Sequence, residues 1–291
     1  GRDRAPKLDL VHTHSPFTMG FFGWRVAKLQ KIPRVSTFHT LLPIYVDYVS
    51  KFGKSILGRI TWRYCRMFYN RHNKIIAPSG ALKKILREHK IGKQIEVIPT
   101  GTDTNFFRPL EKAKARNKLG LGHGKIFLCL GRLGHEKNVD MVIRAIENVD
   151  AKLIITSRGP AEKKLKKLTR KLGLKKKVSF RGFIPDKLKP AYYSAADALV
   201  TASTSETQGM VVVEAMACGC PVIGANSLAI PELVRVKKNG YLFEPGDTKE
   251  LSQILQNFEA SEKMKIAAVK SAVGFSIQRC TDKLEKLYSN L

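Results

Sequence analysis

Short apolar runs alternate with longer amphipathic stretches along most of the chain. Apolar runs of roughly four to eight residues predict buried strands, and apolar positions at helical spacing predict helices between them. Strands separated by helices indicate an α/β fold with parallel, doubly wound sheets. The predicted strands are Leu8–His14, Pro33–Thr40, Lys74–Ser79, Ile95–Gly101, Lys125–Leu130, Lys152–Ser157, Val178–Gly182, Ala198–Ala202 and Pro221–Gly224. Helices are predicted at Phe17–Gln30, between Thr40 and about Asn73, and at Ala81–His89.

One predicted strand leads into the segment Ser203–Val222, STSETQGMVVVEAMACGCPV. After a polar stretch, Met210–Ala217 has the composition of a buried helix, and Gly219 is its expected C-cap. Pro221 then opens the next strand. The segment is therefore expected to form a strand, a loop and a helix.

This segment contains two carboxylates, Glu206 and Glu214, separated by seven residues that include Gly209. We expect Glu206 in the loop at the strand's carboxyl end and Glu214 about one turn into the helix, at the edge where open parallel sheets bind ligands. A carboxylate in an apolar helix needs a partner, and a ribose diol offers two donors to its oxygens. Glu206 could then hold sugar hydroxyls. The alternative is that Glu206 caps the helix and Glu214 bonds to backbone in the core.

A second candidate site, GRLGHEKN, follows the predicted strand Lys125–Leu130. Arg132 and Lys137 flank this turn, and a helix with apolar residues at helical spacing begins after it. Two cations beside the free N–H groups of a helix amino terminus can hold a diphosphate. A basic loop exposed to solvent is the alternative.

Together, GRLGHEKN and SETQGMVVVEAMACGCPVIG resemble the donor site of retaining GT-B glycosyltransferases of family four, a group that includes enzymes making glycolipids. The resemblance implies two Rossmann-like doubly wound domains that face a cleft. It also implies that Arg132 and Lys137 bind the diphosphate of a nucleotide sugar. Glu206 would contact the donor sugar as a catalytic residue, and Glu214 would bind the ribose.

The same resemblance adds further donor contacts. RGFIPDKL matches the family segment that holds the nucleotide base near Phe183 and Ile184, and Gly209 belongs to the donor loop. Family members generally act without a bound metal, and no Asp-x-Asp element lies near the site. We therefore expect a nucleotide sugar as substrate, UDP-hexose in the first place, and neither a metal nor a cofactor.

The first half of the chain carries histidines at two predicted strand ends. His39 lies in TFHT, which is similar to the family segment whose histidine lies beside the reacting sugar, and it is our catalytic candidate in this half. Without that match, a single histidine at a strand end is more often structural. His12 and His14 end the preceding strand and are expected on the acceptor side; they are only a weak metal signal because no other ligand type is near.

A domain boundary is expected near Asn105, because IPTGTDTNFFRP resembles the family's interdomain connection. We expect a partial acceptor-side domain at 1–105, a nucleotide-sugar-binding domain at 106–274, and a terminal helix at 275–291 that crosses back to the first domain. NGYLFEPGD, at Asn239–Asp247, is the expected turn before the last helices. A GT-B first domain normally opens with a strand and a glycine-rich loop, so the first domain is expected to be incomplete.

Positive charge dominates the composition. The chain has 52 basic and 24 acidic residues and a net charge of +28, which implies an anionic partner. Lys51–Lys74 contains seven basic residues and no acid, interleaved with aromatic and apolar residues, as in an interfacial helix on anionic lipid. A solvated basic surface is the alternative for this cluster and for Lys163–Lys177. No nucleic-acid motif accompanies the charge, so no specific nucleic-acid partner is expected. The residues expected on the acceptor or membrane side of this cluster are Arg59, Trp62, Arg63 and Arg66.

The five cysteines lie apart in apolar or helical contexts, which is typical of reduced core thiols in a cytosolic protein. No apolar run approaches the roughly 18 residues of a membrane-spanning helix. We therefore expect a peripheral protein on the cytoplasmic face of the membrane.

These features predict a glycosyltransferase that moves a hexose from a nucleotide sugar to a membrane lipid with retention of configuration. The SETQG string and the TFHT to DYV spacing, Thr37–Val49, are similar to diacylglycerol-type lipid glucosyltransferases in particular. Two alternatives remain open. One is a glycosyltransferase with a soluble anionic acceptor, such as a sugar phosphate or inositol phosphate. The other is a non-catalytic module that binds a nucleotide sugar.

Overall fold

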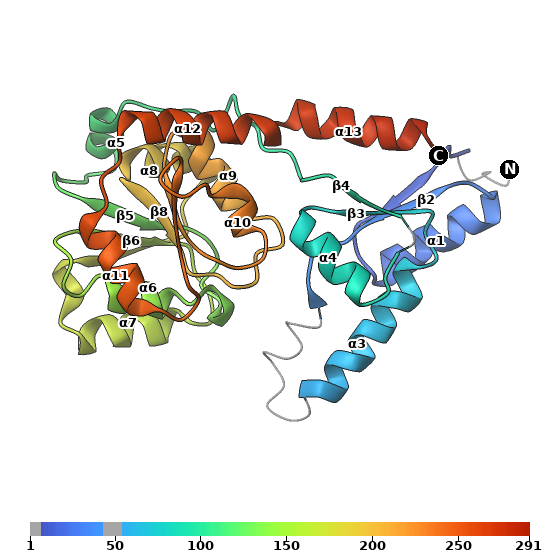
Figure 1. Ribbon diagram of the computed structural model, residues 1–291, viewed down its shortest axis with the longest axis horizontal. Coiled ribbons are helices and arrows are strands. Elements are labelled where there is room, and N and C mark those ends of the chain that lie inside the picture. The colour runs from blue at the N-terminus through green and yellow to red at the C-terminus, as the bar shows by residue number, and fades with distance from the viewer. Residues whose placement is uncertain (1–6, 43–53, 93) are drawn as a thin grey trace, which may run out of the picture. The chain divides into compact units, whose positions relative to one another are not determined.

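The structure is a computed structural model that describes residues 7–42, 54–92 and 94–291 (Figure 1). Its contacts divide the chain into two compact units. Unit 1 comprises Gly1–Thr100 together with Cys280–Leu291, and unit 2 comprises Gly101–Arg279. The expected helix between Thr40 and Asn73 and the TFHT to DYV spacing fall partly on residues 43–53, which lie outside the described residues.

Unit 1 is built on a parallel sheet in the order β1-β2-β3-β4, so each strand lies beside its neighbour in sequence. Its strands are shorter than expected, and each lies within its predicted run. The strands are β1 (Val11–Thr13), β2 (Arg34–Thr37), β3 (Lys74–Ala77) and β4 (Ile95–Val97). The helices in this part are α1 (Thr18–Gln30), α3 (Lys54–Tyr69), α4 (Gly80–Glu88) and α13 (Ile277–Ser289), whose last ten residues belong to unit 1 from Cys280 onward.

Helices on unit 1 are held by buried apolar contacts. Val35 of β2 and Ile76 of β3 point to one side of the sheet and pack with Leu287 of α13. Elsewhere in the unit, α1 packs on α3, where the Phe21 and Phe68 ring centroids lie 5.0 Å apart. Gly20 faces Phe68 at this contact, and a Cβ there would overlap the Phe68 ring, which explains a glycine inside α1.

Unit 2 contains a six-stranded parallel sheet in the order β10-β9-β8-β5-β6-β7. From β5 the chain moves outward through β6 to β7, and from β8 it moves outward in the opposite direction through β9 to β10. The order therefore reverses between β5 and β8, which are hydrogen-bonded neighbours. The strands are β5 (Ile126–Cys129), β6 (Lys152–Thr156), β7 (Val178–Gly182), β8 (Ala198–Thr201), β9 (Val222–Ala225) and β10 (Gly240–Phe243).

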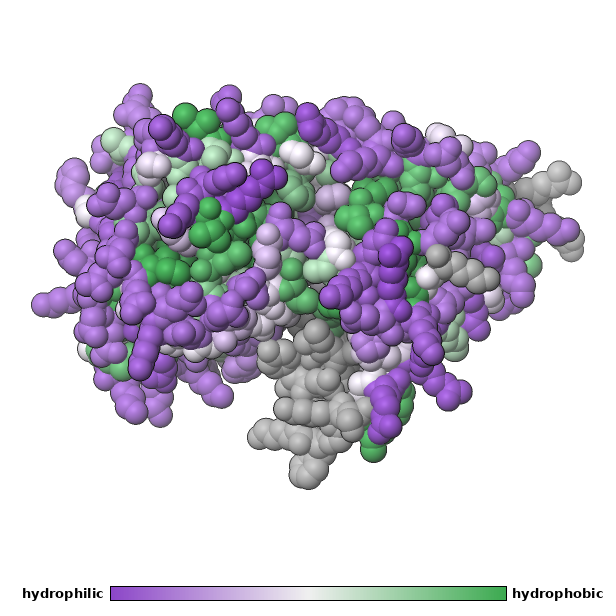
Figure 2. All heavy atoms as spheres, in the orientation of Figure 1, coloured by the Kyte–Doolittle hydropathy of each residue, from purple (hydrophilic) through white to green (hydrophobic). Residues whose placement is uncertain are grey.

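Helices cover both faces of this sheet, as the fully apolar β5 requires. Phe127 and Cys129 pack in one core with α6, α7 and α11, while Ile126 and Leu128 pack in the other with α8, α9 and α12. The helices are α5 (Lys112–Lys118), α6 (Val139–Ala145), α7 (Glu162–Lys171), α8 (Lys189–Ala195), α9 (Met210–Ala217), α10 (Ile230–Leu233), α11 (Thr248–Asn257) and α12 (Glu262–Ala272). Figure 2 shows hydrophilic side chains over much of the visible surface of unit 2.

One expectation was wrong: Asn239–Asp247 is not only a turn, because its centre forms β10, which pairs in parallel with β9. Gly240 lies opposite Val222, and a Cβ on Gly240 would overlap the Val222 carbonyl oxygen. The glycine therefore allows the two backbones to approach rather than simply turning the chain.

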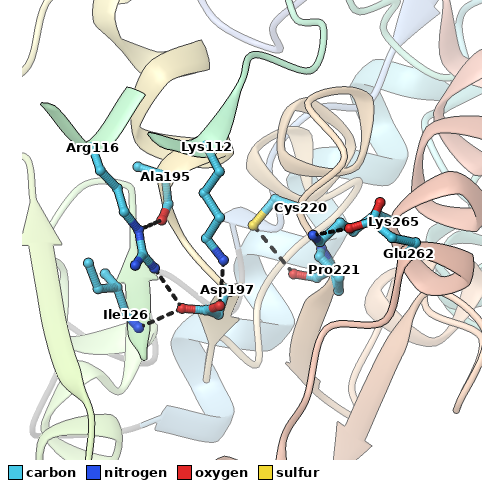
Figure 3. A network of polar contacts seen from close by, with 9 residues as sticks. All are labelled: Lys112, Arg116, Ile126, Ala195, Asp197, Cys220, Pro221, Glu262 and Lys265. Atoms are coloured by element: carbon cyan, nitrogen blue, oxygen red, sulfur yellow. Dashed lines mark hydrogen bonds and ion pairs between the residues drawn. The ribbon is translucent and has the colours of Figure 1, made fainter. Parts of the chain in front are cut away.

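A cluster of ion pairs ties α5 to the amino edge of the unit 2 sheet (Figure 3). Asp197, just before β8, binds Lys112 at 2.5 Å through Oδ1 and Arg116 at 3.0 Å through Oδ2. The Ile126 N–H at the start of β5 also donates to Oδ2, at 2.7 Å. Asp197 thus links α5, β5 and β8.

The five cysteines are free and buried. Burial raises the pKa of the Cys129 thiol to about 12, so it stays protonated in the core. Within the described ranges, no helix is both long and apolar enough to cross a lipid bilayer.

Candidate functional site

The carboxyl edge of the unit 2 sheet brings the two sequence motifs together. GRLGHEKN follows β5 and STSETQG follows β8, and these strands are neighbours where the strand order reverses. At such a point the two outgoing loops diverge and leave room for a ligand. Asn138 Nδ2 donates to the Ala202 carbonyl at 3.1 Å, so a side chain of one loop also holds the other.

Lys137 and Glu206 form an ion pair between the two motifs, with 2.5 Å from Nζ to Oε1. Their side chains are 24% and 15% exposed, so water reaches the pair only partly. Asn138, which follows Lys137, has a left-handed backbone with φ of 48° and lies between the short 3-10 turn and α6. This bend allows Lys137 to leave the helix path and reach the opposite loop.

Arg132 is paired within its own motif. Its guanidinium binds Glu136 at 2.5 Å, with Arg132 54% exposed and Glu136 buried. Gly134 lies directly under this carboxylate, and a Cβ there would overlap both Glu136 oxygens. The loop thus places two cations and one buried acid within six residues, and Arg132 keeps an exposed face for an anion.

Glu214 lies inside α9 and is buried. Its Oε2 accepts a hydrogen bond of 2.7 Å from the Tyr193 hydroxyl of α8. Burial raises the pKa of Glu214, and the Tyr193 hydrogen bond opposes that rise. The bond occupies one of the two carboxylate oxygens. Its donor is a side chain of α8, whereas the expected alternative to a ribose diol was a bond to backbone.

Two further features mark the loop between β8 and α9, which contains Glu206. The Ser205 hydroxyl is buried and has no hydrogen-bond partner among the described residues. Gly209 is the N-cap of α9 with φ of 79°, a left-handed conformation that side chains disfavour. Leu233 and Ile230 also come within 3.1 and 3.2 Å of the position of a Gly209 Cβ.

The expected base-binding residues directly follow β7. Phe183 is 71% exposed, whereas Ile184 is buried in the core with α8 and α9. Backbone hydrogen bonds connect this end of the sheet to the GRLGHEKN loop: Ser157 N–H donates to the Gly182 carbonyl at 2.5 Å, and Leu133 N–H donates to the Arg158 carbonyl at 3.0 Å. The loops after β5, β6 and β7 therefore form one connected rim.

In unit 1, the histidines gather at the carboxyl ends of β1 and β2. His14 Nδ1 and His39 Nε2 lie 2.9 Å apart, at a largely exposed position. His12 is hydrogen-bonded to Tyr288 of α13 at 2.6 Å and to Thr37 at 2.7 Å. Burial and the neighbouring histidines lower the pKa of His12 to about 4. His12 therefore anchors α13, and the His14 and His39 pair is the one open to solvent.

Helix α3 presents arginines and apolar residues together. Ile56 and Ile60, one turn apart, are 57% and 58% exposed, and Arg59 and Arg63 are exposed beside them. Arg66 is partly buried. Trp62 instead stacks on His89, with ring centroids 3.6 Å apart. The side chains of Lys51–Ser55 lie outside the described residues.

Sequence reasoning missed Tyr193, Glu136 and Ser205. Glu136 could have been found, because an acid four residues after Arg132 in the same short loop is close enough to pair with it. Tyr193 could not, since it lies 21 residues from Glu214 and on another helix. No cluster of three or more metal-ligating side chains occurs among the described residues.

Two family models match the chain: glycosyl transferases group 1 over residues 111–272 and glycosyltransferase family 4 over residues 2–106. A relative from Streptococcus pneumoniae, alpha-monoglucosyldiacylglycerol synthase, is 34% identical over 81% of this chain and 56% of its own length. The enzyme of the same name from Acholeplasma laidlawii is 30% identical over 99% of this chain and 77% of its own length. A Mycobacterium marinum D-inositol 3-phosphate glycosyltransferase is 27% identical over 96% of this chain and 63% of its own length.

Solved structures of similar fold include sucrose-phosphate synthase from Thermosynechococcus elongatus, with a TM-score of 0.85 and 25% identity over 97% of this chain and 73% of that one. Anabaena HepE in complex with UDP-glucose has a TM-score of 0.82 and 25% identity over 97% of this chain and 79% of that one. The chain spans just over half the length of the first relative and about three quarters of these solved chains. The chain has the GT-B fold and belongs to the glycosyl transferases group 1 family.

Proposed function

We propose that this protein transfers a hexose from a nucleotide sugar, UDP-glucose in the first place, to a lipid acceptor at a membrane surface with retention of configuration. The observation that carries the proposal is the ion pair of Lys137 with Glu206, which joins the two motifs at the carboxyl ends of β5 and β8. A carboxylate for sugar hydroxyls and a cation for phosphate are thereby fixed side by side.

On the donor side, the diphosphate would take Lys137 and Arg132 as its cations, each giving up part of its present acid pair. Glu206, released from Lys137, would accept hydrogen bonds from sugar hydroxyls. The unpartnered Ser205 hydroxyl beside it would gain a polar partner. Glu214 would accept the ribose hydroxyls while Tyr193 holds its second oxygen. The UDP-glucose complex of the similar HepE structure supports this class of donor.

In the proposed reaction, the bond between the anomeric carbon and the diphosphate oxygen breaks as the acceptor hydroxyl attacks from the same face. The hydroxyl proton passes to the departing phosphate oxygen, so the nucleoside diphosphate leaves with that proton and atoms balance. Negative charge grows on the diphosphate during this step. Lys137 and Arg132 would stabilise that charge, and preorganised charge stabilisation is usually the largest contribution to catalysis. His39, paired with His14, would line the acceptor side.

A lipid acceptor is supported by α3 and by the names of two relatives, both diacylglycerol-type glucosyltransferases. The exposed Ile56 and Ile60 could enter a lipid interface while Arg59 and Arg63 meet anionic head groups. In this proposal the protein binds peripherally to the cytoplasmic face of the membrane.

A soluble anionic acceptor is the second candidate. It is favoured by the similarity to D-inositol 3-phosphate glycosyltransferases and by the net charge of +28, which would attract a phosphorylated sugar or inositol as well as a membrane.

The test is transfer of labelled hexose from a panel of nucleotide sugars, in parallel to vesicles containing diacylglycerol and anionic lipid and to inositol phosphate. We expect lipid-linked product that disappears in Glu206→Gln and persists in Glu262→Gln, which removes one acid of an exposed ion pair with Lys265. Product on inositol phosphate alone would favour the second candidate. Donor binding without product on either acceptor would contradict the proposal.

The proposed binding of α3 to the membrane is tested by vesicle sedimentation. Each arginine near an anionic surface contributes roughly 1 kcal/mol, so Arg59→Gln with Arg63→Gln should weaken vesicle binding by about thirtyfold, with a salt-sensitive remainder. The matched control is Arg25→Gln with Arg87→Gln, two exposed arginines on α1 and α4. Equal losses of vesicle binding in both pairs of variants would mean that the overall charge, and not α3, binds the protein to the membrane.

A further inference from the structure

We propose that unit 1 carries a second anion site, for a phosphate group, at the amino edge of its sheet. A cavity of about 330 Å³ opens there, between the end of α1 and the start of β2. It is lined by Ala27, Lys28, Lys31, Ile32, Pro33, Arg34 and Asn73. Arg34 opens β2 and Asn73 precedes β3, whereas His14 and His39 follow the other ends of the strands. The cavity therefore lies at the amino ends of the strands, whereas the expected acceptor side lies at their carboxyl ends.

The charge of this cavity is one-sided. Three of its seven lining residues are cations, Lys28, Lys31 and Arg34, and none is an acid. None of these cations forms an ion pair with a described acidic residue. Outside the lining, Arg71 contacts the same Trp24 ring as Lys28: the Lys28 Nζ and the Arg71 guanidinium lie 5.4 and 5.3 Å from the ring centroid. Like charges gathered without an acid repel one another, and a bound anion would remove that repulsion.

The Arg34 guanidinium gives the second, independent observation. Its Nε is buried and has no hydrogen-bond partner among the described residues. A buried N–H of a charged group without an acceptor is costly and rare in native proteins. Arg34 lines the cavity, so a phosphate there would give its guanidinium an anionic partner, and the planar guanidinium is the group best suited to that contact.

Backbone contacts fix the cavity in place. Arg34 N–H donates to Asn73 Oδ1 at 2.9 Å, and Asn73 N–H donates to the Arg34 carbonyl at 2.8 Å. Lys31 has a left-handed backbone with φ of 56°, at a helix end where glycine is the preferred residue. Lys28 and Lys31 also complement the negative carboxyl end of α1. That role accounts for the two lysines, but it leaves the buried Arg34 Nε unexplained.

A phosphomonoester or a phosphodiester fits these features, and the phosphate could belong to a soluble metabolite or to a lipid head group. The two sources share the same contacts with Lys28, Lys31 and Arg34. The inference is independent of the proposed transfer reaction, because it concerns the opposite edge of the sheet in unit 1 and is tested by binding alone.

Trp24 supplies a local reporter, since Lys28 lies over its ring and the chain's second tryptophan can be removed. In a Trp62→Phe background, with excess UDP present to fill any donor site, the Trp24 emission is titrated with inorganic phosphate and with glycerol phosphate. In a second arm it is titrated with vesicles of phosphatidylcholine, with and without phosphatidylglycerol. We expect a saturable change in at least one phosphate-bearing arm and none with phosphatidylcholine alone.

The decisive variants are matched in charge and in backbone. Lys28→Gln with Lys31→Gln should weaken binding at least tenfold. The control is Lys84→Gln, on α4, with Lys90→Gln, two residues after the end of that helix. Lys84 is exposed, and Lys90, like Lys31, has a left-handed backbone, with φ of 57°. This control should leave binding unchanged. Arg34→Lys, which keeps the charge but loses Nε, should weaken binding while the thermal unfolding midpoint reports its folding.

Saturation by soluble phosphate supports a metabolite ligand. Saturation only by anionic vesicles supports a head group when Lys28→Gln with Lys31→Gln weakens it and Arg59→Gln with Arg63→Gln does not account for it. Both outcomes support the site. Equal losses in the two lysine pairs, or no saturable change in either arm, would overturn it.

Discussion

Two ion-pair clusters lie at opposite ends of the strands in the unit 2 sheet. One lies at the amino ends of β5 and β8, here called the amino edge, and the other at their carboxyl ends, the carboxyl edge. At the amino edge, Asp197 uses both oxygens on Lys112, Arg116 and the Ile126 N–H. At the carboxyl edge, Glu206 holds one lysine, and the neighbouring Ser205 hydroxyl is buried without a partner among the described residues. A cluster with every acceptor satisfied stabilises a fold, whereas an incompletely satisfied one can exchange partners with a ligand.

The largest effect should come from Glu206→Gln. This change removes the negative charge while keeping the shape, so Lys137 loses its charged partner and, in the proposed reaction, the sugar hydroxyls lose a carboxylate acceptor. We expect hexose transfer to fall by about 10²- to 10³-fold, as for other preorganised polar contacts to a reacting group. The thermal unfolding midpoint should stay within a few degrees of the parent. Full activity in Glu206→Gln would contradict a functional role for the Glu206 cluster.

Asp197→Asn should produce the reverse pattern. The carboxylate is 19% exposed and balances two cations, so its loss leaves Lys112 and Arg116 without an acid in a partly dry setting. We expect the free energy of unfolding to fall by about 3 kcal/mol, measured by urea titration. Transfer per folded molecule should be unchanged. A loss of hexose transfer at unchanged stability would mean that the Asp197 cluster, like the Glu206 cluster, acts in the reaction.

A smaller effect is expected at Glu214, which combines features of both clusters because Tyr193 satisfies only one of its oxygens. Glu214→Gln should weaken UDP-glucose binding about tenfold, the typical contribution of a hydrogen bond to a charged group. Isothermal titration calorimetry measures this change.

The pH dependence of donor binding tests whether the ionised Glu214 carboxylate binds the donor. Burial raises the pKa of Glu214, so the carboxylate is protonated at a higher pH than an exposed glutamate as the solution is acidified. Binding should therefore weaken as the pH falls through that raised pKa. Tyr193→Phe removes the hydrogen bond that lowers the pKa, so the acid limb should move to higher pH. A limb that keeps its position in both Tyr193→Phe and Glu214→Gln would show that it belongs to another group.

The sequence predicted nine strands and the placement of both motifs because these features depend on local patterns. The fully buried apolar run of β5 and the run of apolar residues in α9 follow directly from residue order. The sequence did not predict β10, because Gly240–Phe243 is short and lies between turn-forming residues, and only its pairing with β9 makes it a strand.

Side-chain partners were the least predictable part of the site. The pairs of Lys137 with Glu206 and of Tyr193 with Glu214 join residues 69 and 21 positions apart. No periodicity relates such positions; the reversal of strand order between β5 and β8 brings the first pair together. The resemblance named three of these four residues, but only the folded sheet shows their pairing and identifies Tyr193.

The most direct test is hydrogen–deuterium exchange with and without UDP-glucose. Peptides covering 131–138 and 203–214, at the carboxyl edge, should exchange more slowly in the presence of the nucleotide sugar. Peptides covering 112–116 and the region around Asp197, at the amino edge, should not change. Protection at the amino edge, or no protection at the carboxyl edge, would contradict the assignment of the donor site to the ends of β5 and β8.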